Sequence, residues 1–225
     1  MRVLRGRAGT VEADREASMA MLARTAETGE RAVRVWRPHR QVAFGRRDAG
    51  DAGFERARAA AREHGFPPLE RDVGGRAVAY TGTTVAFART EPVADVRTGL
   101  GDRYERATAD VAGALAALGV DVERGEPPDS FCPGTHSLSA GGKLAGIAQR
   151  VRQGAAVVAG VLVVADHDAI AAVLEDVYRA LDVPLDPGTV GSVARAGGPA
   201  DPDRVVTAVE EALVGDAAVE IERVA

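Results

Sequence analysis

SFCPGTHSLSAGGKLAGIAQRVRQG, residues 130–154, holds the only cysteine and the only lysine of this 225-residue chain. Lysine and arginine together number 28, and Lys143 is the single lysine among them. A thiol and an amine are the usual components of a covalent acyl-transfer site, because the thiolate attacks a carbonyl and the amine moves a proton. On composition alone, Cys132 and Lys143 fit a chance occurrence in an arginine-rich chain equally well.

The same stretch predicts a β-hairpin. The CPG triplet that begins at Cys132 favours a tight turn, because proline fixes φ and glycine accepts positive φ. Residues 137–140 and 143–149 each alternate in the manner of a strand and flank a Gly-Gly pair, which is typical of two paired strands. We therefore expect Cys132 on the loop that enters the hairpin and Lys143 at the start of the return strand. Gly146 within that strand indicates a close backbone approach or a bulge.

A second informative stretch, LERDVGGRAVAYTGTTVAF, occupies residues 69–87. A short strand leads into Gly74-Gly75, and residues 77–80 and 83–87 read as extended again. Taken alone, the two glycines fit an ordinary turn between strands better than a ligand-binding loop.

Both stretches resemble active-site segments of the biotin/lipoate protein-ligase superfamily. The similarity is greatest to its lipoyl/octanoyl amidotransferase branch, the octanoyl-[glycine cleavage H protein]:protein N-octanoyltransferases, and lipoate–protein ligase A is next. In that branch a CPG cysteine precedes a G-[KR]-K-x-x-G-x-x-Q-R segment, and residues 143–150 match its second half. The resemblance extends over roughly residues 30–195. The superfamily's R-x-x-G-G-x-A-V loop is matched at Arg71, Gly74, Gly75, Ala77 and Val78.

The chain departs from the superfamily pattern in three places, one of them a pair of residues. Ser137 stands where an acidic residue is frequent, so the contact made by that acid has no evident source here. Glu70 replaces the first of two consecutive arginines. Tyr80-Thr81 replaces a histidine-aspartate pair that is common in the ligases, which weakens the case for ATP use.

The resemblance implies acyl transfer between carrier-protein lysines. Cys132 is implied as the nucleophile, and Lys143 as the cation that favours its thiolate and as the amine that later takes a proton from the acceptor lysine. His136, four residues after the cysteine, is a possible alternative partner. Small side chains in these motifs, Ala145 among them, leave room for the acyl chain. The expected substrate-binding residues are Arg71, Gly74, Gly75, Ala77, Val78, Gly146 and Ala148.

Three functions remain open from the sequence. The first is an acyltransferase that moves an octanoyl or lipoyl group through a Cys132 thioester and requires no cofactor. Its partners would be lipoyl-carrier proteins, namely glycine cleavage H protein and the lipoyl domains of dihydrolipoyl acyltransferases. The second is an ATP-dependent lipoate–protein ligase, which would use Lys143 with ATP and Mg²⁺ and form no covalent intermediate. The third is a non-catalytic module that binds lipoyl domains.

Composition argues against several other classes. The net charge of −5, the pI near 5.5 and the scattered arginines do not favour a nucleic-acid partner. One cysteine excludes an internal disulfide, and no Cys/His cluster has metal-ligand spacing. The first residues lack an apolar run of signal-peptide length, and no run approaches the roughly 20 apolar residues of a membrane span. A cytoplasmic protein without a membrane partner is therefore expected.

The order of elements predicts an α+β fold with a mixed, largely antiparallel sheet flanked by helices. The resemblance implies the same, the biotin/lipoate protein-ligase catalytic-domain fold. We expect residues 1–225 to form a single catalytic domain, in which about 199–225 is a short C-terminal helical appendage and not a separate accessory domain. Helices are expected over 11–27, 51–64, 99–118, 166–181 and 205–214, and strands over 31–37, 41–46, 120–123, 154–165 and 219–224.

Overall fold

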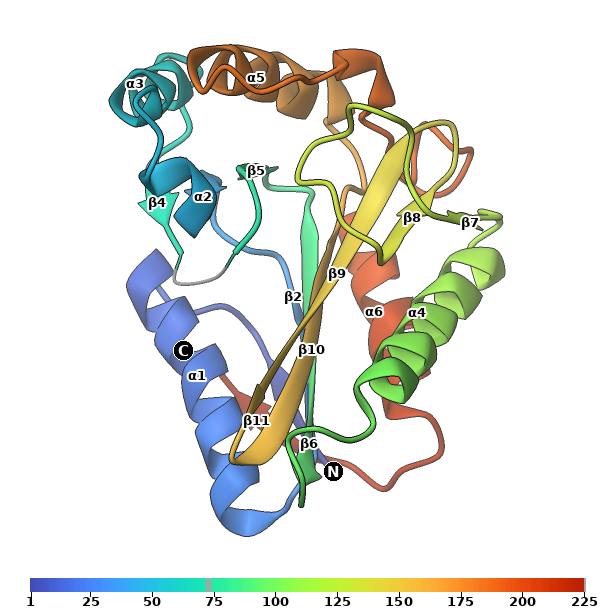
Figure 1. Ribbon diagram of the computed structural model, residues 1–225. Coiled ribbons are helices and arrows are strands. Elements are labelled where there is room, and N and C mark those ends of the chain that lie inside the picture. The colour runs from blue at the N-terminus through green and yellow to red at the C-terminus, as the bar shows by residue number, and fades with distance from the viewer. Residues whose placement is uncertain (72–73, 225) are drawn as a thin grey trace.

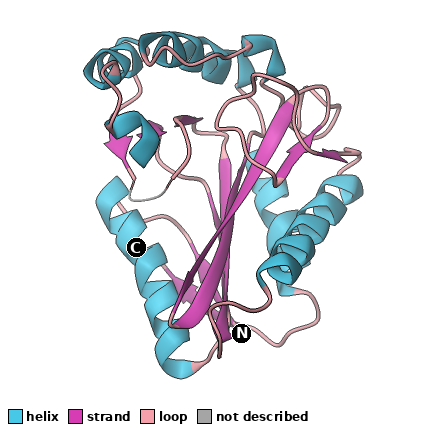
Figure 2. Cartoon of the chain, in the orientation of Figure 1, coloured by secondary structure: helices cyan, strands magenta, loops and turns pink. Residues whose placement is uncertain are grey.

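The computed structural model describes residues 1–71 and 74–224, and within them an eight-stranded mixed sheet runs through the centre (Figures 1 and 2). Its strand order is β11-β1-β2-β6-β10-β9-β8-β7, and a smaller sheet has the order β4-β3-β5. The strands are β1 (Arg2–Arg5), β2 (Ala32–Trp36), β3 (Gln41–Phe44), β4 (Pro68–Glu70), β5 (Val78–Tyr80), β6 (Val85–Val93), β7 (Glu123–Arg124), β8 (Ser137–Ser139), β9 (Lys143–Arg152), β10 (Gly154–Leu162) and β11 (Glu220–Arg223). The helices are α1 (Val11–Thr28), α2 (Arg46–Ala49), α3 (Phe54–Glu63), α4 (Leu100–Ala117), α5 (His167–Ala180) and α6 (Pro202–Val214), with a 3₁₀ turn η1 at Pro187–Thr189.

The middle of the large sheet is antiparallel, and one edge is parallel. β10 pairs with β6 on one side and with β9 on the other, while β1 runs parallel to both β2 and β11. Valine and alanine dominate β10, as suits a strand that is covered on both faces. At Gly160 a Cβ would lie 2.4 Å from the ring of Phe87, so a glycine is required for that ring to lie across the strand. The predicted α+β class and largely antiparallel sheet are confirmed.

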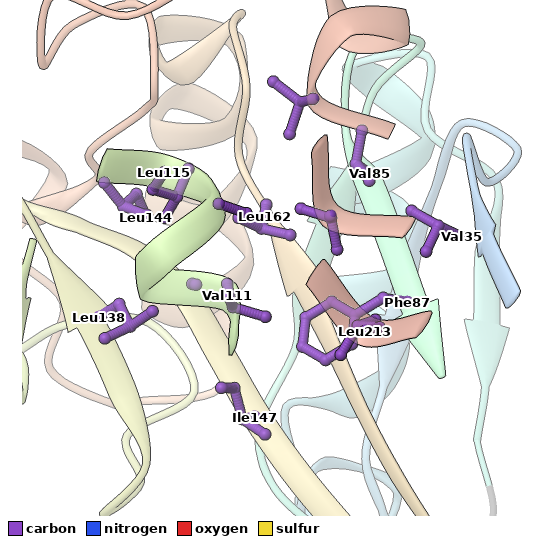
Figure 3. Close-up of a cluster of buried hydrophobic side chains, with 14 of the residues drawn as sticks. Val35, Val85, Phe87, Val111, Leu115, Leu138, Leu144, Ile147, Leu162 and Leu213 are labelled. Atoms are coloured by element: carbon purple, nitrogen blue, oxygen red, sulfur yellow. The ribbon is translucent and has the colours of Figure 1, made fainter. Parts of the chain in front are cut away.

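Helices cover both faces of the large sheet. α1 lies against one face over β6 and β10, and α4 and α6 lie against the other (Figure 1). Figure 3 shows the apolar cluster on the side of α4 and α6, where Val111 and Leu115 of α4 meet Phe87, Leu144 and Leu162 of the sheet. This cluster fixes the position of β9, whose first residue is Lys143.

A second apolar cluster lies under the small sheet and determines where the loop before β8 sits. α3 and α5 lie side by side over this cluster (Figure 1). Phe44 of β3 and Tyr178 of α5 are both buried in it. Phe131 from the loop before β8 is buried in the same cluster, and Cys132 packs against it. The thiol is therefore anchored between the two sheets.

Several predicted elements differ in detail. The helix expected over 51–64 is α3, which begins only at Phe54, because a Cβ at Gly53 would lie 1.9 Å from the carbonyl oxygen of Ala180. The short helix α2 before it was not predicted. The strand expected over 120–123 is only β7, since Val120 instead completes the end of α4, where its N–H donates to the carbonyl of Leu115. The β8–β9 hairpin is as predicted, but its register shift falls between Leu138 and Ser139 and not at Gly146.

The last described residues are part of the sheet and its core. Val205, Val209 and Leu213 of α6 are buried in the cluster of Figure 3, and β11 adds an edge strand beside β1. The division of the chain into one catalytic domain without an accessory domain stays a prediction. Across residues 1–71 and 74–224, we find no helix with the length and apolar character needed to cross a membrane.

Candidate active site around Cys132

Cys132 lies on the loop between β7 and β8, the yellow-green segment in Figure 1, in an uncommon backbone conformation. Its φ is 42°, in the left-handed region that non-glycine residues rarely occupy unless their surroundings hold them there. Its N–H donates to the hydroxyl of Tyr178 at 2.6 Å, and that hydroxyl donates to the carbonyl oxygen of Ala77 at 3.0 Å. One buried hydroxyl therefore ties the cysteine to the strand end that follows the Gly-Gly loop.

Arg71 brings a positive charge to the thiol. Its Nη2 lies 3.6 Å from Sγ of Cys132 and donates to the carbonyl oxygen of Arg76 at 2.7 Å. Burial alone would lower the pKa of Arg71, but the charges of Tyr80 and Cys132 outweigh burial, so the pKa is raised and the guanidinium remains a cation. Gly75 closes the same side with a φ of 94°, and a Cβ there would lie 3.0 Å from Sγ. A side chain at this position would crowd the thiol.

Lys143 bonds to the backbone of the cysteine loop. Its buried Nζ donates to the carbonyl oxygens of Phe131 at 2.9 Å and Cys132 at 2.7 Å, and it forms an ion pair with Glu126 at 2.6 Å. The register shift in the β8–β9 pair lies beside Lys143, and such bulges re-aim neighbouring side chains. Within the described residues, the cation in hydrogen-bond contact with Sγ is Arg71 and not Lys143.

Glu126 holds the turn after the cysteine together. Its Oε1 accepts the N–H of Gly134 at 2.8 Å, and its Oε2 accepts the hydroxyl of Ser137 at 2.7 Å and contacts Nζ of Lys143. Ser137 stands where the superfamily frequently has an acid. In this chain the carboxylate beside Lys143 comes from Glu126, and Ser137 is one of its hydrogen-bond donors.

A second ion pair supports the Gly-Gly loop from the side of α2. Arg76 pairs with buried Asp48 at 3.1 Å, and the other oxygen of Asp48 accepts the N–H of Gly45 at 3.0 Å. A Cβ at Gly45 would lie 2.1 Å from the carbonyl oxygen of Gly75, so the loop rests on the backbone at the start of α2. A hollow of about 360 Å³ opens beside it. Its lining residues are Arg47, Arg76, Asp129, Ser130, Pro133, Val183 and Pro184.

The structure brings five of the ten candidate site residues expected from the sequence into one region. Arg71 contacts the thiol of Cys132, Gly75 lies beside both of them, and Lys143 bonds to the cysteine carbonyl. Gly146 lies beside Lys143, since a Cβ there would be 3.9 Å from Nζ.

The other expected substrate-binding residues have different surroundings. Ala77 and Val78 are buried in the apolar cluster under the small sheet, whereas Gly74 is exposed. Ala145, also expected to leave space for the acyl chain, is buried in the cluster of Figure 3. Ala148 is exposed on β9, beyond the residues of β9 that pair with β8. None of these residues lines the hollow beside the cysteine loop.

His136 packs against α4. Its ring stacks on Tyr104, with ring centroids 3.7 Å apart and planes 9° from parallel. Among residues 1–71 and 74–224, no hydrogen bond joins the His136 ring to Cys132. No group of three or more His, Cys, Asp or Glu side chains within the same residues is arranged to hold a metal ion.

Sequence reasoning missed two residues of the site, Glu126 and Tyr178. Tyr178 could have been found from the sequence, because its hydroxyl is the polar group on a helix face that otherwise presents Ile170, Val173 and Val177. A buried tyrosine hydroxyl needs a hydrogen-bond partner. Glu126 lies before the recognisable motif, in an EPPD run that reads as a solvated loop, and only the fold brings it to Lys143.

The architecture is that of lipoate–protein ligases. A lipoate-protein ligase A structure with bound ATP superposes with a TM-score of 0.78 at 19% identity, over 100% of this chain and 89% of that one. A putative lipoate protein ligase from T. acidophilum with bound lipoic acid superposes with a TM-score of 0.70, also at 19% identity, over 99% of this chain and 88% of that one. These likenesses establish the fold.

The chain belongs to the lipoyl protein ligase A/B catalytic domain family, whose family model matches residues 15–214. Two curated relatives are octanoyl-[GcvH]:protein N-octanoyltransferases, from Geobacillus kaustophilus at 35% identity and from Exiguobacterium sibiricum at 34%. The matches cover 56% and 66% of this chain and 45% and 55% of the relatives. The chain thus spans about half the length of the curated relatives it matches. The superfamily that residues 69–87 and 130–154 predicted is confirmed, and these two relatives carry the name of the predicted branch.

Proposed function

We propose that this chain is an acyltransferase that moves an octanoyl or lipoyl group between lysines of carrier proteins through a thioester on Cys132. The observation that carries the proposal is the surroundings of the thiol. Sγ lies 3.6 Å from the guanidinium of Arg71, and the carbonyl of the same cysteine accepts from Nζ of Lys143. A nucleophile, a cation and a group able to move protons therefore meet in one turn.

The first half of the reaction breaks the amide of the donor. The Cys132 thiolate attacks the acyl carbonyl, the C–N bond to the donor lysine breaks, and the departing amine takes up the proton that the thiol gave up. The products are an acyl thioester on Cys132 and a free lysine on the donor. In the second half, the amine of the acceptor lysine attacks the thioester and loses a proton, and the thiol is restored.

Lys143 and Glu126 are suited to the proton movements. Nζ is 2.7 Å from the carbonyl oxygen of Cys132 and 2.6 Å from Oε2 of Glu126, so a proton arriving at the amine has a carboxylate beside it. The pair is almost entirely shielded from water on the lysine side, which has 1% of its side chain exposed. Proton transfer within such a pair is a general acid–base role.

The names of the curated relatives support the choice of substrates. They are octanoyltransferases whose donor is GcvH, the glycine cleavage H protein. We infer an octanoylated or lipoylated glycine cleavage H protein as the donor and the lipoyl domains of dihydrolipoyl acyltransferases as acceptors. Because the bond broken and the bond formed are both lysine amides, the exchange is nearly balanced in free energy and requires neither ATP nor Mg²⁺.

The direct test mixes the purified chain with octanoylated H protein and unmodified lipoyl domain, with and without ATP. We expect the intact mass of the lipoyl domain to rise by one acyl group at equal rates in both samples. Modification only from free octanoate or lipoate, and only with ATP, would assign the chain to the ligases. Binding of the lipoyl domain without any modification would assign it to the binding modules.

A further inference from the structure

A reactive thiolate at Cys132 is favoured by a positive charge beside Sγ, and Lys143 does not contact Sγ. Nζ of Lys143 is engaged by two backbone carbonyls and by Glu126. Among the described residues, the hydrogen bond to Sγ of Cys132 comes from Nη2 of Arg71. A cation placed beside a thiol favours the thiolate, which is the reactive form.

One hydrogen-bond donor of Arg71 is available for a further partner. Its Nε is buried, and within the described residues it has no hydrogen-bond partner. A buried N–H without a partner is uncommon, because leaving it unpaired costs free energy. Nε and Nη2 lie on the same edge of the planar guanidinium, and this edge commonly binds two atoms of one partner at once. One of these two nitrogens already contacts the nucleophile.

We propose that Arg71 is a catalytic residue of the acyl transfer: it stabilises the Cys132 thiolate through Nη2 and donates from Nε to the oxygen of the acyl carbonyl. This role rests on the proposed function and adds to it a named source for the positive charge. When the thiolate attacks, negative charge moves from Sγ to the carbonyl oxygen, and a fixed guanidinium interacts with both positions. A preorganised donor of this kind favours the tetrahedral intermediate over the bound substrate.

Arg71 and Lys143 are suited to different steps of the reaction. Arg71 is effectively always charged, so it is suited to stabilising a thiolate and an oxyanion but not to carrying a proton. A lysine amine, unlike a guanidinium, is able to exchange a proton, and Lys143 has the carboxylate of Glu126 beside it as a partner for that exchange. The raised pKa of Arg71 agrees with a permanently charged role.

The test measures the thiol itself before any acyl transfer. Alkylation of Cys132 by iodoacetamide is followed against pH for the wild-type chain and for Arg71→Met, Arg71→Lys and Lys143→Met. At pH 7 we expect Arg71→Met to lower the alkylation rate about tenfold, through a smaller thiolate fraction. Arg71→Lys should retain part of the rate, and Lys143→Met should retain more of it than Arg71→Met, because Arg71 and not Lys143 contacts Sγ. Arg47→Met is the matched control, because it removes an exposed arginine beside the same loop.

Thioester formation from octanoylated H protein is then measured on the same variants. We expect Arg71→Met to form the thioester at least about a hundredfold more slowly, the size reported for loss of one oxyanion donor. Thermal unfolding monitored by circular dichroism identifies a variant that fails to fold, in which case Arg71→Lys carries the comparison. A wild-type rate of alkylation and acylation in folded Arg71→Met would overturn the inference and leave the proposed function intact. Absence of transfer by the wild-type chain would instead count against the proposed function, while the alkylation profile still reports the Arg71 contact.

Discussion

Glu126 and Lys143 form a buried ion pair, with Oε2 and Nζ 2.6 Å apart, directly beneath the turn that carries the cysteine. Glu126 comes from the loop before that turn and Lys143 from the strand after it. The pair therefore fastens both ends of the turn, and the carbonyl of Cys132 accepts from the same ammonium. The ion pair between Glu126 and Lys143 therefore both holds the thiol in position and places an exchangeable proton beside it.

Glu126→Gln should impair both the position of the cysteine turn and the proton transfer. The amide retains the shape of the side chain but leaves the buried ammonium of Lys143 without its counter-charge, so we expect a loss of about 3 kcal/mol in the free energy of unfolding. Acyl transfer should fall more than tenfold. Chemical denaturation and the transfer assay measure the two effects, with Glu123→Gln on exposed β7 as the matched control. Equal transfer rates in both variants would show that the carboxylate has no role.

Lys143→Met and Lys143→Arg separate charge from proton transfer. Arginine retains the charge but does not lose a proton in the working range, and methionine retains neither. We expect both variants to acylate Cys132 faster than they pass the acyl group to the acceptor lysine, because deprotonation of that amine is the step that needs Lys143. Single-turnover measurement of the two half-reactions checks this. Full transfer by both variants would remove Lys143 from the mechanism.

Gly75→Val should abolish acyl binding and, because a β-branched residue is strained at positive φ, should also lower the midpoint of thermal unfolding. Gly75 has a φ of 94°, and its Cβ would lie 3.0 Å from Sγ of Cys132 and 3.2 Å from Nη2 of Arg71. Gly74→Val is the control, because a Cβ at Gly74 meets nothing within 4 Å. Transfer activity is measured beside the midpoint of thermal unfolding. If Gly75→Val transfers as well as Gly74→Val, the two glycines are only a connector.

Tyr178→Phe should leave the N–H of Cys132 without its acceptor. We expect a loss of about 1–3 kcal/mol in the free energy of unfolding, the cost of a buried unpaired donor, and a fall in kcat larger than the change in KM. Burial raises the pKa of Tyr178, and a thiolate at Cys132 raises it further, so the hydroxyl stays protonated and the defect should not vary with pH. Tyr104→Phe, which retains the ring that stacks on His136, is the control. A pH-dependent defect would contradict this role.

Short-range patterns in the sequence predicted the hairpin of the site, but they did not predict the contacts between segments that are far apart in the chain. The hairpin follows from alternation around two glycines, and Cys132 and Lys143 lie where that pattern predicts them. The motifs also named Arg71 and Gly75, but as residues that bind the acyl group. Their contact with Sγ depends on how the small sheet packs against the large one, and no periodicity within a single stretch of sequence encodes that.

The remaining differences have a common physical origin. Ala148 was expected near the acyl group because it is small and lies within the motif, but it is exposed in the structure. Whether a strand residue is exposed depends on what covers that face of the sheet. Glu126 and Tyr178 reach the site only through tertiary contacts across 17 and 46 residues. The three strands of the small sheet were each expected, but their pairing into a sheet of their own was not, because strand pairing depends on contacts between separate stretches of sequence.

The most direct test of the central proposal is whether Cys132 carries the acyl group. The wild-type chain is mixed with octanoylated or lipoylated H protein, without acceptor and without ATP, and its intact mass is measured before and after neutral hydroxylamine. We predict one acyl group on the wild-type chain, lost on hydroxylamine treatment as a thioester is, and none on Cys132→Ala, which should also lose transfer activity. A Cys132→Ala chain that still transfers the acyl group at the wild-type rate would contradict the thioester mechanism.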